Sequence, residues 1–377
     1  MFSNVAWRGR MAAVTGVCAA GLAVAGVLSA GTATAQPSAA AAAQAPAPWS
    51  QVGPGWELVQ YSSGSSAHLT TLYLVSPAGT RYALRTTHNE QFALVGWSGD
   101  KTRALLFDDA AGKVEQLTLK TGKVSTFAMG GQTSPQGYTL PDGLNVVAIT
   151  DNGSFFTLAR YGLTGKLVKV LVRDKFAFSE VYAPSGATLA VAGRSGVRLV
   201  SNAGGVIRAL NVPGTVPAIG CTPVRWWNSG TILANCSANP NLEPRLWLVP
   251  ANGAKPVALT PQRSSKGPDL GDIDAWRLTS GLYLQSLGAC GTLEINKQAA
   301  NGSVTPVHVA GTPNTHNSIV TAAGPRLLID PQNGCQPGGG LLWYNPGTRA
   351  EQWLFPYSAR ATVSVIAFNS LENAPAA

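Results

Sequence analysis

Charge is scarce in this sequence, and the charges that occur are scattered. Charged residues make up 12% of the 377 residues, and Lys and Arg outnumber Asp and Glu by 27 to 18. No run of like charge occurs, and no basic stripe lies beside aromatic residues. Because nucleic-acid binding requires such a basic footprint, we expect no nucleic-acid partner. The net charge of +9 is compatible with a weak attraction to anionic wall polymers or head groups.

Helical patterning and catalytic motifs are also scarce. Beyond residue 35, no stretch keeps apolar residues at positions i, i+3, i+4 and i+7 for more than a turn or two. Short apolar runs separated by Gly, Asn, Asp and Pro dominate, which is typical of strands. No G-x-S-x-G motif and no separate α/β region is present to carry a triad of the prolyl-peptidase kind. The sequence therefore predicts an all-β protein and identifies no catalytic residue.

The first 35 residues have the features of an export signal. Arg8 and Arg10 form a basic start, an apolar run follows, and Ala33-Thr34-Ala35 provides the small-x-small pattern of a cleavage site. The apolar run is also long enough to approach a membrane span, so an uncleaved anchor is the alternative. Residues 36–50 are rich in Ala, Gln and Pro and are interpreted as a flexible spacer. We expect a secreted or cell-envelope protein without a membrane span after cleavage.

Cysteine is rare, and its number is even once the export signal is set aside. Cys221, Cys236, Cys290 and Cys335 remain, with spacings of 15, 54 and 45 residues. An even count in an exported chain favours disulfides. Zinc binding is the alternative, but no C-x-x-C pair supports it.

Glycine marks an internal repeat. One series of turn glycines has spacings of 44, 44, 43, 44, 51 and 43 residues, and a second series runs in phase with it. Glycine is favoured in tight hairpin turns because these turns require positive φ. The first series is Gly55, Gly99, Gly143, Gly186, Gly230, Gly281 and Gly324, and the second is Gly79, Gly122, Gly165, Gly204, Gly253, Gly302 and Gly347.

Each repeat is predicted to form four antiparallel strands, A to D, with one glycine in the A–B turn and the other in the C–D turn. In the second unit these strands are Phe92–Trp97, Arg103–Phe107, Val114–Leu119 and Val124–Phe127. Seven such sheets bury both faces when they stack radially, so we predict a seven-bladed β-propeller at residues 51–370. A solenoid is the alternative, but solenoid repeats of this length are usually helical.

The first unit lacks a convincing strand A, and the end of the chain provides one. Its strand A position is Gln51-Val52-Gly53-Pro54, which is poor in strand formers, whereas Thr362–Phe368 is a strand left over after the seventh unit. We predict that Thr362–Phe368 completes the first blade and closes the ring, which removes an exposed sheet edge. Residues 371–377 are expected to form a disordered tail.

The repeats resemble those of TolB-like, WD40-like β-propellers, which carry a W-S-P-D-G turn and a later L-Y-V-x-x-x-x-G-x-x-x-x-L-T segment. Trp97-Ser98-Gly99-Asp100 approximates the turn, and Leu72–Leu84 and Leu246–Thr260 match the second segment. The resemblance covers Trp56 to Phe368, and the repeats are degenerate. It implies a propeller of a family that includes a protein-binding envelope component. The Ala- and Gly-rich composition is typical of a high-GC actinobacterium, which lacks the outer membrane of the Tol system.

The strand plan predicts how the cysteines pair. Cys221 and Cys236 lie symmetrically about the Asn228-Ser229 turn between strands A and B of the fifth unit, so they face each other across the hairpin. Cys290 and Cys335 each follow strand B in adjacent units. We therefore predict the disulfides Cys221–Cys236 and Cys290–Cys335.

The plan also predicts a binding face. The B–C and D–A loops share one face, and the long loops of units five to seven lie there, so we expect binding at this rim and at the mouth of the central channel. Each candidate has a structural alternative. The first set, Asp269, Asp272 and Asp274, offers ligands for Ca²⁺ or consists of solvated loop acids. The second set, His68, His88 and His316, forms a metal site or consists of isolated imidazoles. Trp226 and Trp227 alternate across a strand, so at least one is expected in the core, and the other offers a stacking surface.

We therefore expect a secreted, monomeric, non-catalytic propeller that binds a protein or a cell-envelope polymer and needs no cofactor. The alternative is a propeller lyase or glycoside hydrolase with acids or histidines at the channel mouth, although spacing assigns no pair of carboxylates. A structural envelope protein without a small ligand is the third interpretation.

Overall fold

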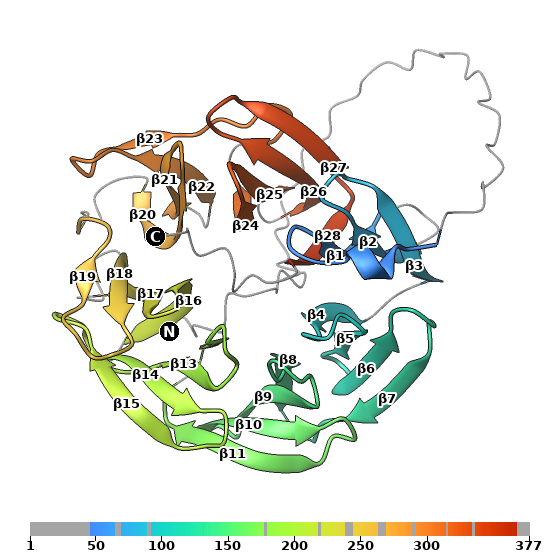
Figure 1. Cartoon of the computed structure of the whole chain (residues 1–377), viewed down its shortest axis with the longest axis horizontal. Coiled ribbons are helices and arrows are strands. Elements are labelled where there is room, and N and C mark those ends of the chain that lie inside the picture. Colours follow the sequence, from blue (N-terminus) through green and yellow to red (C-terminus); the bar gives the residue numbers. More distant parts are fainter. Residues whose placement is uncertain are drawn as a thin grey trace, which may run out of the picture.

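The computed structural model is a ring of seven four-stranded antiparallel sheets, the blades of a β-propeller (Figure 1). It describes residues 46–64, 69–88, 92–130, 132–176, 179–217, 220–237, 244–262, 269–288, 292–313, 316–333 and 336–367. The predicted fold class is therefore confirmed. Within the described residues, no helix is long and apolar enough to cross a membrane.

The strands of the first four blades follow one another across each sheet in the order A, B, C, D. Blade 1 contains β28 (Thr362–Ala367), β1 (Glu57–Ser62), β2 (Leu69–Val75) and β3 (Arg81–His88); blade 2 contains β4 (Ala93–Trp97), β5 (Arg103–Asp108), β6 (Lys113–Thr118) and β7 (Val124–Ala128); blade 3 contains β8 (Thr133–Tyr138), β9 (Asn145–Asp151), β10 (Phe156–Gly162) and β11 (Leu167–Asp174); blade 4 contains β12 (Glu180–Tyr182), β13 (Thr188–Ala192), β14 (Gly196–Ser201) and β15 (Val206–Asn211).

The remaining three blades follow the same order, and a short 3₁₀ helix, η1 (Trp49–Gln51), precedes the first blade. Blade 5 contains β16 (Cys221–Asn228), β17 (Thr231–Cys236), β18 (Arg245–Pro250) and β19 (Val257–Ala258); blade 6 contains β20 (Asp269–Leu278), β21 (Gly281–Gly288), β22 (Leu293–Gln298) and β23 (Val304–Pro306); blade 7 contains β24 (Asn317–Ala323), β25 (Arg326–Asn333), β26 (Gln336–Asn345) and β27 (Ala350–Ser358).

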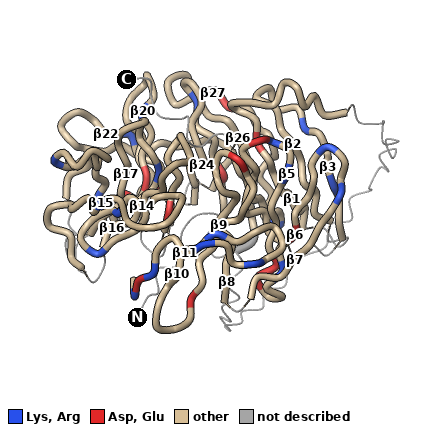
Figure 2. Tube along the Cα trace, turned by 60° about the horizontal axis from the view of Figure 1, so that its bottom comes forward, with Lys and Arg blue, Asp and Glu red and all other residues tan. Residues whose placement is uncertain are grey.

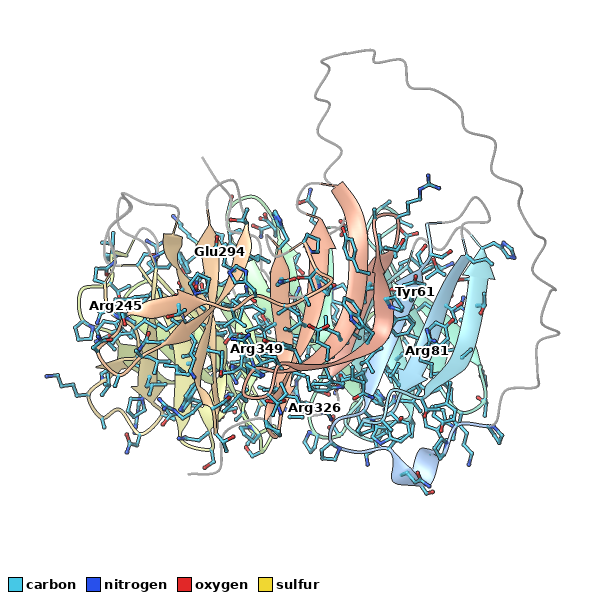
Figure 3. All side chains as sticks on the ribbon, turned by 90° about the horizontal axis from the view of Figure 1, so that it is seen from above. Tyr61, Arg81, Arg245, Glu294, Arg326 and Arg349 are labelled. Carbon is cyan, nitrogen blue, oxygen red and sulfur yellow. A yellow bond between two sulfur atoms is a disulfide. The ribbon has the colours of Figure 1, made fainter. Side chains whose placement is uncertain are left out.

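The ring closes as the sequence predicts. β28 pairs antiparallel with β1, from Glu57 opposite Ala367 to Ser62 opposite Thr362. Both faces of this joint are packed: Val363 and Val365 contact the cluster shared with blade 7, and Ile366 contacts the cluster shared with blade 2. Figure 3 shows Tyr61 and Arg81 of blade 1 where that blade meets blade 7, and the Tyr61 ring stacks on Phe355 at 4.9 Å. The last strand therefore holds the first blade in place.

The hydrophobic core is divided among the blades. The described residues form seven buried clusters, and each lies between two neighbouring blades. In blade 2, for example, Ala104 and Leu106 pack toward blade 1, whereas Leu105 and Phe107 pack toward blade 3. Successive strand residues point to opposite faces, so each blade contributes to two clusters. The blades are therefore apolar on both faces and depend on their neighbours for stability.

The C–D turns bring neighbouring blades into close contact. At Gly165, φ is +80°, and an added Cβ would lie 2.0 Å from the carbonyl oxygen of Ala128, at the end of strand D in blade 2. At Gly204, φ is +98°, and the next residue, Gly205, donates its N–H to the carbonyl oxygen of Leu171 in blade 3 at 3.1 Å. Each of these turns thus requires glycine for its positive φ and packs against strand D of the preceding blade.

Amide side chains connect strand B of several blades to strand A of the next. Gln60 accepts the N–H of Leu94 at 2.8 Å and donates to the carbonyl oxygen of Phe92. Gln285 makes the same two bonds to Ile319 and Asn317. In blade 5, Asn235 donates to the carbonyl oxygen of Asp272 at 3.0 Å. We call these three residues the amide clasps.

Blade 7 has an acid at the clasp position. In strand B of blade 6, Tyr283 faces the next blade, and Gln285 is two residues further along on the same face. In strand B of blade 7, Leu328 faces the next blade, and Asp330 is two residues further along, so Asp330 occupies the position that Gln285 has in blade 6. Asp330 is buried; one carboxylate oxygen accepts a hydrogen bond from Gln332 at 2.9 Å, and within the described residues the other has no partner. Burial raises the pKa of Asp330 to about 7. Among the described residues, the closing joint between blades 7 and 1 therefore has no amide clasp.

The end of the predicted spacer belongs to the folded domain. Trp49, in η1, and Ala47 pack against the cluster between blades 1 and 2, which includes Val52 and Trp56. The Ala- and Pro-rich composition of residues 36–50 gave no indication of this contact, because a single tryptophan anchors the segment. The predicted export signal lies outside the described residues.

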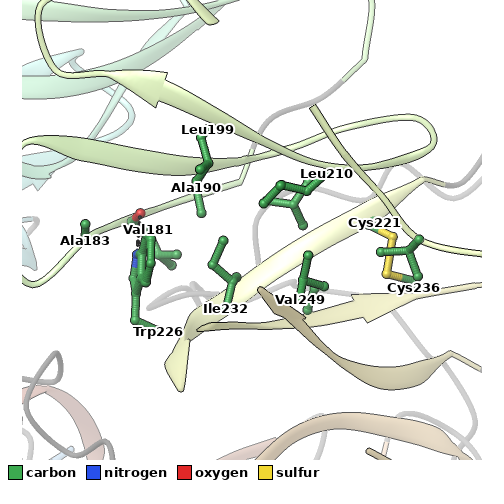
Figure 4. Close-up of a cluster of buried hydrophobic side chains, with 13 residues drawn as sticks. Val181, Ala183, Ala190, Leu199, Leu210, Cys221, Trp226, Ile232, Cys236 and Val249 are labelled. Atoms are coloured by element: carbon green, nitrogen blue, oxygen red, sulfur yellow. Dashed lines mark hydrogen bonds between the residues drawn. A yellow bond between two sulfur atoms is a disulfide. The ribbon is translucent and has the colours of Figure 1, made fainter. Parts of the chain in front are cut away.

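The Cys221–Cys236 disulfide forms as predicted, with the two Cα atoms 4.3 Å apart (Figure 4). Both cysteines are buried in the cluster between blades 4 and 5, and they are direct partners in the β16–β17 ladder. The other predicted disulfide, Cys290–Cys335, lies outside the described residues and stays a prediction.

Replacing Cys221 and Cys236 by serine is expected to lower the free energy of unfolding by about 3 kcal/mol, the loop-closure value for a 15-residue loop. Urea unfolding of the oxidised protein and the double variant measures this difference. Peptide mapping without reduction tests the pairing, and a peptide that joins Cys236 to Cys290 would contradict it.

Candidate functional site

The two ends of the propeller differ in their connections. The A–B and C–D turns lie on one face, which we call the turn face, and the B–C and D–A connections lie on the opposite face, which we call the loop face. The antiparallel order of every blade places them so. Several segments of the predicted rim lie outside the described residues, namely 218–219, 238–243, 263–268, 289–291, 314–315 and 334–335.

The predicted acids of blade 6 have partners within the protein. The Asp272 carboxylate is buried and accepts a hydrogen bond from the hydroxyl of Ser286 at 2.8 Å, and that hydroxyl accepts one from Asn296. Asp274 pairs with Arg225 of blade 5 at 3.1 Å. Asp269 belongs to β20, but its side chain is outside the described set. These contacts connect neighbouring strands and blades. Among the described residues, no group of three His, Cys, Asp or Glu side chains could hold a metal ion.

The predicted histidines lie at the loop face without a described cluster. His88 is exposed at the end of β3 in blade 1. His316 precedes β24 in blade 7, beside Leu293, and partial burial lowers its pKa. His68 lies outside the described residues, so the predicted three-histidine site stays a prediction.

Both tryptophans predicted for binding are buried, so neither offers an exposed ring. Trp226 packs in the cluster between blades 4 and 5, and its indole N–H donates to the carbonyl oxygen of Val181 at 3.4 Å. Trp227 packs in the cluster between blades 5 and 6, with the Arg225 guanidinium 5.3 Å from its ring centroid. The expectation of a stacking surface on this strand was wrong, because a blade between two neighbours buries both faces of its strand.

A cavity opens on the loop face where blades 3 and 4 meet. Its volume is about 190 Å³, and it lies between the end of β11, the B–C turn of blade 4 and the end of β15. Its polar lining includes Asp174, Arg194, Ser195, Arg198 and Asn211. Ligand pockets for whole small molecules usually have about 300–1,000 Å³. This cavity therefore has room for one chemical group at the end or side of a larger partner.

The cavity wall is held by a charged pair. Arg198 donates to the Asp174 carboxylate at 2.7 Å and makes two further bonds to the carbonyl oxygen of Ala192. Asp174 also accepts the N–H of Phe176 at 3.2 Å. Both partners are partly buried, so the Asp174 charge is largely compensated within the wall.

Basic residues flank this compensated pair: Arg173 and Lys175 are the chain neighbours of Asp174, and Arg194 lines the cavity. Arg173 and Lys175 lie over the Phe155 ring, with 4.5 and 5.6 Å between the cation and the ring centroid. Arg194 is exposed at the tip of the B–C turn and has no ion-pair partner among the described residues. We call Arg173, Lys175 and Arg194 the cationic rim. An acidic group that enters the cavity therefore meets Arg194 and one neutralised acid, while Arg173 and Lys175 belong to the chain segment that forms the cavity edge.

The disulfide supports this turn from the neighbouring blade. Gly193, at the start of the B–C turn, exchanges two backbone hydrogen bonds with Cys221, at 2.8 and 3.2 Å. Because Cys221 is covalently joined to Cys236, the turn that carries Arg194 is attached to a disulfide-bonded hairpin. The cavity is therefore preformed by the scaffold.

Loop length was the wrong signal for finding this cavity. The B–C turn of blade 4 is short, so loop length gives no indication of the cavity beside it. A better signal was the concentration of arginine and lysine in Arg173-Asp174-Lys175 and at Arg194, which the ring brings to the same face. Figure 2 shows that Lys and Arg are otherwise spread around the ring.

Comparisons with known proteins show the fold. No protein-family model matches the chain, and no curated protein matches it. Among solved structures, the chain is similar to a puromycin-hydrolyzing peptidase of Mycobacterium tuberculosis, with a TM-score of 0.55 and 14% identity over 81% of this chain and 52% of that one. It is also similar to a prolyl endopeptidase, with a TM-score of 0.51 and 14% identity over 83% of this chain and 50% of that one.

A TolB structure from Acinetobacter baumannii matches with a TM-score of 0.44 and 13% identity over 82% of this chain and 66% of that one. The chain spans about half the length of the two peptidases. At these identities the shared property is the fold alone, and this chain is a seven-bladed β-propeller.

Proposed function

We propose that this chain is a secreted, non-catalytic binding propeller that captures an acidic group of a protein or a cell-envelope polymer on its loop face. The observation that carries the proposal is the cavity between blades 3 and 4 with its cationic rim. The cavity size favours one carboxylate or phosphate group of a larger partner over a free small molecule. The predicted export signal supports a location where such polymers occur.

Binding is supported over catalysis by the state of the acids near the cavity and in blade 6. Asp174 is paired with Arg198, and Asp274 with Arg225. Asp272 accepts a hydrogen bond from Ser286. A glycosidase requires two carboxyl groups facing one substrate bond, whereas these carboxylates are engaged in contacts within or between blades.

Replacing Lys175 and Arg194 together by alanine is expected to weaken binding to an acidic polymer by roughly tenfold for each charge-assisted hydrogen bond that is removed. The probes are poly-glutamate and polyphosphate, and the measurement is titration calorimetry or surface binding at two salt concentrations. Binding by the parent protein should also weaken at high salt, because exposed charges are screened.

The matched control replaces Arg277 and Lys297, which are exposed near the turn face in blade 6. It removes the same charge from the opposite face and should leave polymer binding unchanged. Equal weakening in both variants would show that net charge alone attracts the polymer. No binding together with hydrolysis of the polymer would favour the enzyme alternative.

A further inference from the structure

Among the residues that the structure describes, large exposed apolar side chains are confined to four consecutive blades. The described residues include eight of them, each between 39% and 63% exposed, and all lie in blades 2 to 5. Seven belong to the outer D strands and most directly follow a C–D turn, while the eighth lies in the A–B turn of blade 3. They are Val124, Leu144, Leu167, Val168, Val170, Val206, Ile207 and Val257.

The same outer segments carry charge of only one sign. The C–D turns and the beginnings of the D strands in blades 2 to 5 contain six cations and no acid: Lys120, Lys123, Lys166, Lys169, Arg208 and Lys255. The acids of the nearby A–B turns have partners of their own, since Asp100 accepts a hydrogen bond from Ser98 and Asp142 accepts one from Thr139. We call this edge the apolar–basic rim.

The apolar–basic rim is continuous from blade to blade. Gly205, in the C–D turn of blade 4, bonds to Leu171 of β11 at 3.1 Å. Arg208 of β15 donates to the carbonyl oxygen of Ala251 in the C–D turn of blade 5. Figure 1 shows β7, β11, β15 and β19 following one another along the outer edge of the ring. The rim therefore forms one surface, with its highest density of apolar residues in blades 3 and 4.

We propose that the apolar–basic rim binds the surface of an anionic lipid bilayer. Exposed apolar patches mark interaction sites, and an apolar surface interspersed with Lys and Arg is the composition of interfacial membrane-binding elements. Lysine is depleted in protein–protein interfaces, whereas five of the six rim cations are lysine. The composition thus favours a lipid surface over a protein partner.

This orientation leaves the loop face free. The rim lies next to the turn face, and the cavity with its cationic rim opens on the opposite face. A propeller resting on a bilayer through blades 3 and 4 therefore presents the cavity away from the membrane. The membrane proposal stands on different residues from the proposed polymer binding and does not depend on it.

The test is co-sedimentation of the purified protein with vesicles. We expect binding to vesicles of phosphatidylcholine and phosphatidylglycerol in equal amounts, and none to pure phosphatidylcholine. Replacing Lys166 and Lys169 by alanine should weaken the partition about 30-fold, since each cation near an anionic surface contributes about a factor of five. The Val168→Asp, Ile207→Asp double variant should bind at least as weakly, because it removes apolar contacts and adds repulsion.

The matched control is the Ala83→Asp, Ala350→Asp double variant, which places the same two charges at exposed positions on the outer strands of blades 1 and 7. It should retain vesicle binding within about threefold, since each exposed charge lies outside the rim and acts through screening solvent. Thermal melting of all variants verifies that they fold.

Absence of vesicle binding by the parent protein, equal weakening in the control, or binding to poly-glutamate through the rim without vesicle binding would each overturn the lipid assignment. The Lys175, Arg194 variant should bind vesicles normally, which separates the two proposals.

Discussion

Deletion of residues 360–377 is expected to abolish the cooperative unfolding transition of the propeller. The deletion removes β28, whose six residues pair with β1. It also uncovers two clusters, because Val363 and Val365 contact one side of the joint and Ile366 contacts the other. Residues such as Val59 and Val75, which are fully buried in the intact ring, would then face water. The deletion thus exposes apolar surface of two hydrophobic clusters to water, which lowers the free energy of unfolding.

Circular dichroism during heating, together with urea unfolding, measures this effect. Deletion of residues 371–377 alone is the control, and it should leave the transition unchanged. The Val365→Asp variant provides a milder form of the same test, because it places a charge in the joint without shortening the chain. A protein lacking residues 360–377 that melts cooperatively at the parent temperature would contradict closure by β28.

The free energy of unfolding is expected to fall as the pH rises from about 4 to about 8. Burial raises the pKa of Asp330 to about 7 and the pKa of Glu57 well above its ordinary value. Both acids face the joint between blades 7 and 1, and within the described residues neither Glu57 oxygen has a hydrogen-bond partner. The folded protein therefore favours their protonated forms.

The sign of the effect follows from the direction of these pKa shifts. The unfolded chain releases the Asp330 proton near pH 4, whereas the folded chain holds it until about pH 7. Stability from this group is complete below pH 4 and is lost progressively as the pH rises to about 7. A difference of about three pKa units corresponds to about 4 kcal/mol for this fully buried carboxyl.

The Asp330→Asn variant should remove much of this pH dependence. An amide at this position cannot ionise, and it restores the group type that Gln60, Asn235 and Gln285 use as amide clasps. The variant should therefore be more stable than the parent at pH 8 by up to about 4 kcal/mol and similar to it at pH 4. Urea unfolding at pH 4, 6 and 8 measures the difference.

Asp109→Asn provides the control, because Asp109 is exposed in the B–C turn of blade 2. That substitution should leave the pH profile of stability as it is in the parent. A parent protein whose stability is flat between pH 4 and 8, or an Asp330→Asn variant with the parent profile, would show that Asp330 does not govern the joint.

The number of blades and the strand limits were predictable because they depend on local chemistry. Turn glycines and alternating apolar residues act over a few positions, and the predicted strands of unit two agree with β4 to β7 to within one residue at each end. Closure by β28 was predictable for a related reason: when seven units are expected to have four strands each, one strand is missing at the start of the chain and one is in excess at its end. The Cys221–Cys236 pairing followed from the symmetry of a single hairpin.

The candidate site was less predictable because it is assembled from separate blades. Asp174 and Arg198 are 24 residues apart in sequence, and only the angle between blades 3 and 4 brings them to 2.7 Å. The prediction of an exposed tryptophan was wrong for the same reason: Trp226 and Trp227 would be accessible on an isolated strand, but both faces of that strand are covered in the ring.

The sequence by itself determined a closed seven-bladed β-propeller with one disulfide-bonded hairpin. Turn glycines, the alternation of apolar residues and the register of a single hairpin are properties of residues that are close together in the chain. Only the tertiary structure decided which side chains remain exposed, where the cavity lies and that Asp330 occupies the closing joint at the position of an amide clasp. These features depend on how each blade stacks against the next, and that stacking brings together residues whose spacing in the sequence carries no signal of their proximity.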